Sequence, residues 1–168
     1  VNKKMEKLFK KRLEIEFVGF DSFNGFGEIS KDDENPTFKS EFFKINEKKV
    51  FKNIKKNSKG QRFRLIKGFY KDTLGNKTTQ DLDIEKSSII LIDCDLKEST
   101  KFALEFSKPS FQLGTILIFD DFNYYKGDET KGEYGAFEEF KKKNSHISFR
   151  RIFDYGYSGR AFIISKIN

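Results

Sequence analysis

The sequence is poor in cysteine, methionine, tryptophan and proline. Its 168 residues include one cysteine, one methionine, two prolines and no tryptophan. A single cysteine excludes an internal disulfide bond and a zinc site built from several cysteines. Cys94 lies between two acidic residues just after an apolar run. We therefore interpret it as a small, reduced side chain that fills space, in preference to a nucleophile.

Long apolar runs are also missing. No stretch approaches the roughly 18 residues of a membrane span, and no signal peptide is recognisable. These absences predict a soluble, cytoplasmic protein with no membrane partner. The length is typical of one domain, so we expect residues 1–168 to form a single domain. The 21 phenylalanines predict a core packed with aromatic rings.

The net charge is positive. Lysine and arginine total 33 against 26 aspartates and glutamates, which gives a formal charge of +7. Such an excess by itself favours an acidic partner such as nucleic acid. The lysines are scattered beside glutamate and asparagine on segments with helical spacing, so we expect a solvated surface and no nucleic-acid partner. A basic nucleic-acid-binding domain stays as an alternative that rests on net charge alone.

Two short apolar runs, residues 89–92 and 115–119, end abruptly in acidic residues. Both are typical of parallel strands buried on both faces. Helix-forming residues fill positions 96–107 between them, so the segment predicts a β-α-β unit with a right-handed crossover. The carboxyl ends of the two strands then lie at one edge of the sheet. We expect Asp93, Asp120 and Asp121 to converge there.

The rest of the chain predicts an α/β fold with a mostly parallel sheet flanked by helices. We expect strands at 13–20 and 62–67, and helices at 41–57 and 135–144. Two final strands, 148–153 and 160–165, are predicted to form an antiparallel hairpin that closes the sheet. No repeat, low-complexity tract or second domain is visible.

Three carboxylates at one point repel each other unless protons or a cation intervene. Oxygen ligands with no histidine or cysteine nearby favour Mg²⁺, with Mn²⁺ or Ca²⁺ as alternatives. A metal held in this way binds two neighbouring hydroxyls and lowers the pKa of one of them. The competing interpretation of Asp120 and Asp121 is ordinary solvation at a strand end. Asp95 matches the N-cap of the following helix, so we predict a capping role for it.

Other side chains suggest a nucleotide-like ligand or a proton acceptor. Asp21 ends a strand, where a carboxylate holds ribose hydroxyls in doubly wound folds; an Asx turn or a cap through Ser22 is an equal alternative. Gly68 and Phe69 follow another strand, where an aromatic ring either stacks on a base or belongs to the core. His146 is the only histidine, and we weigh it as a general base against a turn or surface role.

Four segments resemble one family over nearly the whole chain. They are FDSFNGFGE, KGFYKDTL, IDCDLKEST and GTILIFDDFNYY. Together they look like the macrocin O-methyltransferase-like group of class I S-adenosylmethionine-dependent methyltransferases. The resemblance implies a Rossmann-like sheet and a Mg²⁺ ion held by Asp93, Asp120 and Asp121. It also implies S-adenosylmethionine as cofactor, with Asp21 on its ribose and with Ser22, Gly68, Phe69 and Asp93 as further contacts. A sugar or other small molecule is the expected substrate, and a homo-oligomer is compatible with the resemblance.

One part of the family pattern is not found in this sequence. The family's first strand and glycine-rich loop are expected before Val1, so the chain is expected to lack both. Two explanations stay open, an excerpt of a longer protein and a degenerate copy. The second would make the chain a catalytically silent module that serves in binding or interaction.

Overall fold

The computed structural model describes residues 15–35, 38–58 and 60–168. Its strands are β1 (Glu16–Asp21), β2 (Arg62–Lys67), β3 (Ile89–Ile92), β4 (Ile116–Phe119), β5 (Ile147–Tyr155) and β6 (Gly159–Ile167). Its helices are α2 (Glu47–Asn57), α3 (Tyr70–Thr73), α4 (Lys97–Ser107) and α5 (Gly132–Lys143). Short 3₁₀ segments cover Lys31–Asp33, Gln80–Leu82 and Lys108–Ser110. No helix in these ranges is long and apolar enough to cross a membrane.

The larger sheet has four strands in the order β3-β4-β6-β5. β3 and β4 are parallel, with Ile89 opposite Ile116, and α4 connects them, which confirms the predicted β-α-β unit. β6 runs antiparallel to both β4 and β5. The predicted closing hairpin is therefore correct, and its second strand is the one that pairs with the parallel part of the sheet.

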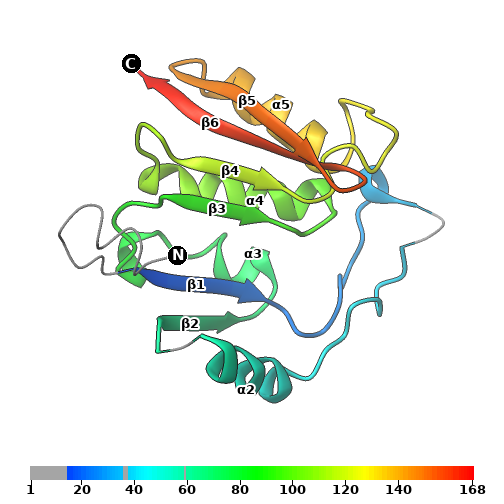
Figure 1. Ribbon diagram of the computed structural model, residues 1–168. Coiled ribbons are helices and arrows are strands. Elements are labelled where there is room, and N and C mark those ends of the chain that lie inside the picture. Colours follow the sequence, from blue (N-terminus) through cyan, green and yellow to red (C-terminus); the bar gives the residue numbers. More distant parts are fainter. Residues whose placement is uncertain (1–14, 36–37, 59) are drawn as a thin grey trace.

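The smaller sheet consists of the parallel strands β1 and β2, which α2 connects. Figure 1 shows that the arrows of β1, β2, β3 and β4 all point the same way. Among the described residues, no strand pairs with the side of β1 or of β3 that faces the other sheet. The carboxyl ends of all four parallel strands nevertheless lie toward one side of the molecule.

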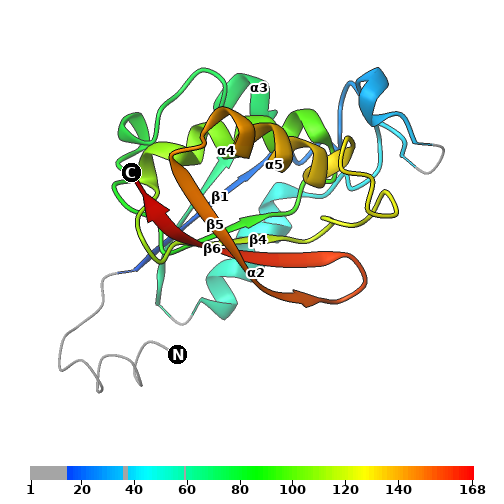
Figure 2. The same cartoon turned by 90° about the horizontal axis from the view of Figure 1, so that it is seen from above.

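The core lies between the larger sheet and the helices α4 and α5, which pack on each other along one face of it (Figure 2). Aromatic rings dominate it, as the abundance of phenylalanine predicts. Phe137 contacts Phe119, Phe149 and Phe162, with ring centroids 4.6 to 5.1 Å apart. This packing joins α5 to β4, β5 and β6.

The prediction that β3 is buried on both faces is wrong. Ile92 is 2% exposed, but Ile89 and Leu91 are 62% and 61% exposed. Alternate residues of a strand point to opposite faces, and in the described part of the chain α4 and α5 cover one face only. The strand type was predictable because β-branched residues favour strands whether or not both faces are covered.

The helix predicted from residue 41 begins only at Glu47. The side chain of Asn46 caps it by accepting a hydrogen bond from the backbone N–H of Lys49 at 3.1 Å. Phe42 and Phe43 lie in a turn before this cap, and Phe43 has a left-handed backbone with φ 63°. Apolar spacing continued through the turn, so periodicity alone placed the helix start too early.

Candidate metal centre at the carboxyl ends of the strands

Three acidic side chains meet where β3 and β4 end. Asp93 follows β3, and Asp120 and Asp121 follow β4. One carboxylate oxygen from each lies within 4.8 Å of the other two. Asp93 and Asp120 are exposed, and Asp121 is half-buried. The predicted convergence of these three residues is confirmed, and we call them the acid triad.

The β5–β6 hairpin holds the acid triad from one side. The hydroxyl of Tyr155 lies 2.9 Å from Oδ1 of Asp120, to which it can donate. The Ser158 hydroxyl lies 3.0 Å from Oδ1 of Asp121. The backbone N–H of Asn123 donates to the Ser158 carbonyl at 3.0 Å, so the loop after β4 is fastened to the hairpin as well. These contacts orient two carboxylates without neutralising them.

Asp95 is a fourth acidic residue of the site, and its predicted capping role is wrong. The N-cap position of α4 is Leu96, and Asp95 has a left-handed backbone with φ 58°. Its side chain is hydrogen-bonded to Asp121 instead. Burial, and next the charge of Asp121, raise the pKa of Asp95 to about 7. Asp95 therefore holds a proton at this site up to nearly neutral pH in the absence of a cation.

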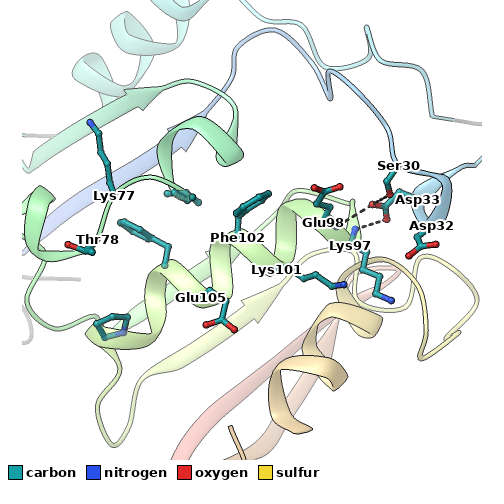
Figure 3. Close-up of a pocket in the computed structure, with 14 residues that line it drawn as sticks. Ser30, Asp32, Asp33, Lys77, Thr78, Lys97, Glu98, Lys101, Phe102 and Glu105 are labelled. Carbon is teal, nitrogen blue, oxygen red and sulfur yellow. Dashed lines mark hydrogen bonds between the residues drawn. The ribbon is translucent and has the colours of Figure 1, made fainter. Parts of the chain in front are cut away.

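The cap of α4 comes from a distant loop. The carboxylate of Asp33 accepts hydrogen bonds from the backbone N–H groups of Lys97 at 2.6 Å and Glu98 at 3.2 Å (Figure 3). Asp33 is completely buried. A cap that comes from a distant segment leaves no local sequence pattern, so sequence analysis could not predict it.

Glu133 is the fifth acidic residue, and sequence reasoning missed it. It lies in the first turn of α5, ahead of residue 135, where that helix was predicted to begin. The side chain is completely buried and accepts hydrogen bonds from the backbone N–H groups of Cys94 and Asp121. Burial, with the charges of Asp121 and Asp95, raises the pKa of Glu133 well above its ordinary value.

The five carboxyl groups have no basic partner among the residues that the structure describes. None of the ion pairs there involves Asp93, Asp95, Asp120, Asp121 or Glu133. Loss of hydration and the charges of Asp120 and Asp121 raise the pKa of Asp93 as well. Oxygen ligands with unbalanced negative charge are the donor set that suits Mg²⁺ and similar hard cations.

The residues predicted to contact a cofactor lie at the ends of β1 and β2. Oδ1 of Asp21 accepts a hydrogen bond from the N–H of Phe23 at 2.5 Å, which is the Asx turn of the alternative interpretation. The Ser22 hydroxyl donates to the Gly25 carbonyl at 2.7 Å. The charge of Asp21 also contributes to the raised pKa of Asp93, so it acts on the acid triad.

Gly68 and Phe69 lie beside Asp21. The N–H of Gly68 donates to the carbonyl of Asp21 at 3.0 Å. Gly68 has φ 144°, and a Cβ there would approach Cγ2 of Thr73 to 2.7 Å, so only glycine fits. Phe69 is the N-cap residue of α3, and its ring lies against Gly27.

The structure does not bring His146 to the acid triad. It is exposed and directly precedes β5, at the end of the hairpin where Ile147 pairs with Ile167. The triad contacts the other end, where Tyr155 pairs with Gly159. Cys94 is closer, but burial raises the pKa of its thiol well above the ordinary value, in keeping with a space-filling role.

A cavity of about 620 Å³ lies along the outer side of α4, next to the loop that carries Asp33 (Figure 3). Phe102 and Phe106 are among the apolar residues that line it, and Lys77 and Lys101 are among the basic ones. None of the acid triad lines it. The cavity and the metal centre are thus separate features.

The strand arrangement with acids at the strand ends defines the class I methyltransferase fold. The O-methyltransferase NovP is 21% identical with a TM-score of 0.66, and the match covers 89% of this chain and 60% of NovP. The calicheamicin methyltransferase CalS11 is 22% identical with a TM-score of 0.63, covering 87% of this chain and 59% of CalS11. An O-methyltransferase from Bacillus cereus in complex with SAH is 14% identical, with a TM-score of 0.53 and coverages of 90% and 74%. The chain thus spans about three fifths of the length of NovP and CalS11.

Sequence comparison places the chain within this class. The family profile of macrocin-O-methyltransferase (TylF) matches residues 11–149, so the chain belongs to that family. A comparison with curated proteins finds no significant match. The resemblance expected from the four segments is therefore confirmed.

Proposed function

We propose that this chain belongs to an S-adenosylmethionine-dependent, Mg²⁺-assisted O-methyltransferase that acts on a hydroxyl group of a sugar or another small molecule. The observation that carries the proposal is the acid triad, whose three carboxylate oxygens lie within 4.8 Å of one another at the strand ends. Membership of the macrocin-O-methyltransferase family supports the reaction type. We also propose a cytoplasmic location and a homo-oligomeric assembly.

Asp93, Asp120 and Asp121 would hold the Mg²⁺ ion. When bound, the ion supplies Lewis acidity, which lowers the pKa of a coordinated hydroxyl, and a preference for two adjacent oxygens. Tyr155 and Ser158 orient the carboxylates of Asp120 and Asp121 for this task. A vicinal diol, as many sugars carry, is the acceptor that such a site favours.

Asp95 is the residue of the site best suited to take up a proton. Its carboxyl is hydrogen-bonded to Asp121, and its pKa is raised to about 7. Binding of the cation would displace this proton, and the ionised carboxylate could then accept a proton from the acceptor hydroxyl. We assign this role to Asp95 in preference to His146, because His146 lies at the other end of the β5–β6 hairpin.

S-adenosylmethionine would lie across the ends of β1 and β3. It would supply an electrophilic methyl group on a sulfonium sulfur, which leaves as the neutral thioether of S-adenosylhomocysteine. Asp21 would accept hydrogen bonds from its ribose. Ser22 follows Asp21 in the sequence, and Gly68 and Phe69 lie beside it at the end of β2. The structure of the Bacillus cereus relative in complex with SAH supports this choice of cofactor. Transfer requires the acceptor oxygen to lie in line with the methyl carbon, so positioning supplies much of the rate.

The description of one relative supports a sugar acceptor. CalS11 is described as a TDP-rhamnose 3'-O-methyltransferase. That description belongs to CalS11. For this chain, the separation of the three carboxylate oxygens fits one metal ion, which would in turn bind two adjacent hydroxyls.

Calorimetry on this chain tests the proposal. S-adenosylhomocysteine is titrated with excess Mg²⁺ and again with EDTA, and Mg²⁺ is titrated alone. We expect Mg²⁺ to bind with one site per chain, and we expect S-adenosylhomocysteine to bind in either medium. Absence of binding by both would contradict metal and cofactor binding by this chain and favour a silent binding module. Mg²⁺ binding with no uptake of S-adenosylhomocysteine would support the metal centre and contradict cofactor binding by this chain.

A further inference from the structure

We propose that Glu133 is a positioning residue that sets the geometry of the metal centre from the helix side. The inference rests on the proposed function, because it concerns the same acid triad. Glu133 would not touch the cation. It would hold the two loops that carry the ligands at the separation that a single ion requires.

The hydrogen bonds of Glu133 join two loops that are distant in sequence. Its Oε1 accepts from the N–H of Cys94 at 3.3 Å, and its Oε2 accepts from the N–H of Asp121 at 3.0 Å. Cys94 directly follows Asp93 at the end of β3, and Asp121 is itself a triad residue at the end of β4. One side chain therefore ties together the backbone on which both strand ends present their carboxylates.

The packing around Glu133 restricts the position of its side chain. It lies in the first turn of α5, whose residues Phe137 and Phe140 are 0% and 4% exposed in the core. Gly132, just before it, has φ 53° and lies so close to the Tyr125 ring that a Cβ there would come within 2.6 Å of it. The start of α5 is thus held by the core on one side and by the Tyr125 ring on the other. A displacement of Glu133 would require these side chains to repack.

Stability alone does not explain a carboxylate at this position. Burial of a charged group costs free energy, and an apolar side chain of similar size is often neutral or stabilising at such a site. Glu133 is completely buried and has no ion-pair partner among the described residues. Two acceptor oxygens side by side, in contrast, match two N–H donors from two loops.

The β5–β6 hairpin and α5 hold the triad from different directions. Tyr155 and Ser158 contact the side chains of Asp120 and Asp121, whereas Glu133 contacts the backbone beneath them. Among the described residues, the hairpin gives Asp93 no hydrogen bond of this kind. The end of β3 is joined to the end of β4 by the backbone bond from the N–H of Asp120 to the carbonyl of Ile92 and, beyond the last ladder bond, by the bridge from Cys94 through Glu133 to Asp121.

Metal binding by variants tests the role of Glu133. Mg²⁺ is titrated by calorimetry into the chain, into Glu133→Gln and into the control Glu138→Gln. Glutamine keeps the shape but has one acceptor oxygen, so its amide group would face one of the two N–H donors. We expect Glu133→Gln to weaken Mg²⁺ binding by about tenfold or more. Glu138 lies on the same helix and pairs with Lys141, so its variant should bind as the unmodified chain does.

The outcomes separate this inference from the function on which it rests. If a folded Glu133→Gln chain binds Mg²⁺ as tightly as the unmodified chain, Glu133 has no positioning role, although the metal centre stands. If the unmodified chain binds no Mg²⁺, the metal centre and this inference both fail. Amide hydrogen exchange on the unmodified chain decides the case in which the variant does not fold. Slow exchange at Cys94 and Asp121 supports the bridge, and exchange at the rate of an unstructured peptide overturns it.

Discussion

The carboxylate of Asp33 accepts a hydrogen bond from the backbone N–H of Lys97 at 2.6 Å, across 64 residues of sequence. The same carboxylate reaches the N–H of Glu98, and the hydroxyl of Ser30 lies 3.1 Å from it. The loop between β1 and α2 is thereby fastened to the first turn of α4. Because α4 begins just after Asp93 and Asp95, this cap also fixes the path of the chain as it leaves the metal centre.

Replacement of Asp33, which caps α4, should lower the stability of the folded chain. We expect Asp33→Ala to reduce the free energy of unfolding by about 2 kcal/mol, because two N–H groups of α4 lose a buried partner. Urea unfolding followed by circular dichroism measures the change. Asp32→Ala is the matched control, since Asp32 is exposed and lies next to Asp33. Equal midpoints for the two variants would contradict the capping role.

Loss of one triad carboxylate should remove metal dependence. We expect Asp120→Asn to weaken Mg²⁺ binding by at least about tenfold and to abolish metal-dependent methyl transfer, because the ion loses a charged ligand. Calorimetry and transfer from labelled S-adenosylmethionine measure the two effects. Asp128→Asn is the control, because Asp128 is bonded to Thr130 outside the triad. Full activity of Asp120→Asn would rule out the metal assignment.

The hydroxyl of Tyr155, which contacts Asp120, should increase the affinity of the metal centre for Mg²⁺. Tyr155→Phe removes the hydroxyl that lies 2.9 Å from Oδ1 of Asp120 while leaving the ring in place. We expect Mg²⁺ affinity to fall by about tenfold, as for other residues that orient metal ligands. Tyr157→Phe serves as the control, since Tyr157 is 97% exposed. The same loss in both variants would mean that the hydroxyl of Tyr155 has no specific effect.

The pKa of Asp95 predicts a pH dependence of metal binding. Burial and the charge of Asp121 raise this pKa to about 7, so the metal-free site carries a proton that Mg²⁺ must displace. We expect Mg²⁺ affinity to rise between pH 6 and 8, with proton release on binding. Calorimetry in two buffers of different ionisation enthalpy measures the protons released. Affinity that does not change over this range would contradict a protonated Asp95.

The same group affects stability in the absence of metal. Its pKa in the folded chain is above the ordinary 3.8, so its contribution to stability is complete below pH 4 and is lost as the pH rises through about 7. In EDTA we expect the free energy of unfolding to fall by on the order of 1 to 2 kcal/mol between pH 5 and 8, allowing for solvent screening. Asp121→Asn should reduce this fall, because it removes the largest charge that acts on Asp95. A larger fall in that variant would contradict the coupling.

The strands were predictable because their signals are local. Residues 62–67 and 89–92 were placed with the bounds that the structure has, since runs of β-branched and apolar residues bounded by polar ones specify a strand. Helix starts were less predictable. The start of α2 was placed early and that of α5 late, because a helix start depends on which group satisfies its first N–H donors. For α4 that group is Asp33, which no local pattern reveals.

The sequence by itself determined the strands, the β-α-β crossover and the meeting of Asp93 with Asp120 and Asp121. The physical reason is that parallel strands joined by one right-handed crossover must end at the same edge. Only the tertiary structure decided the roles of Asp95, Asp33 and Glu133. Each of these carboxyl groups takes its role from partners or burial supplied by other elements, and such contacts exist only once the helices have packed on the sheet.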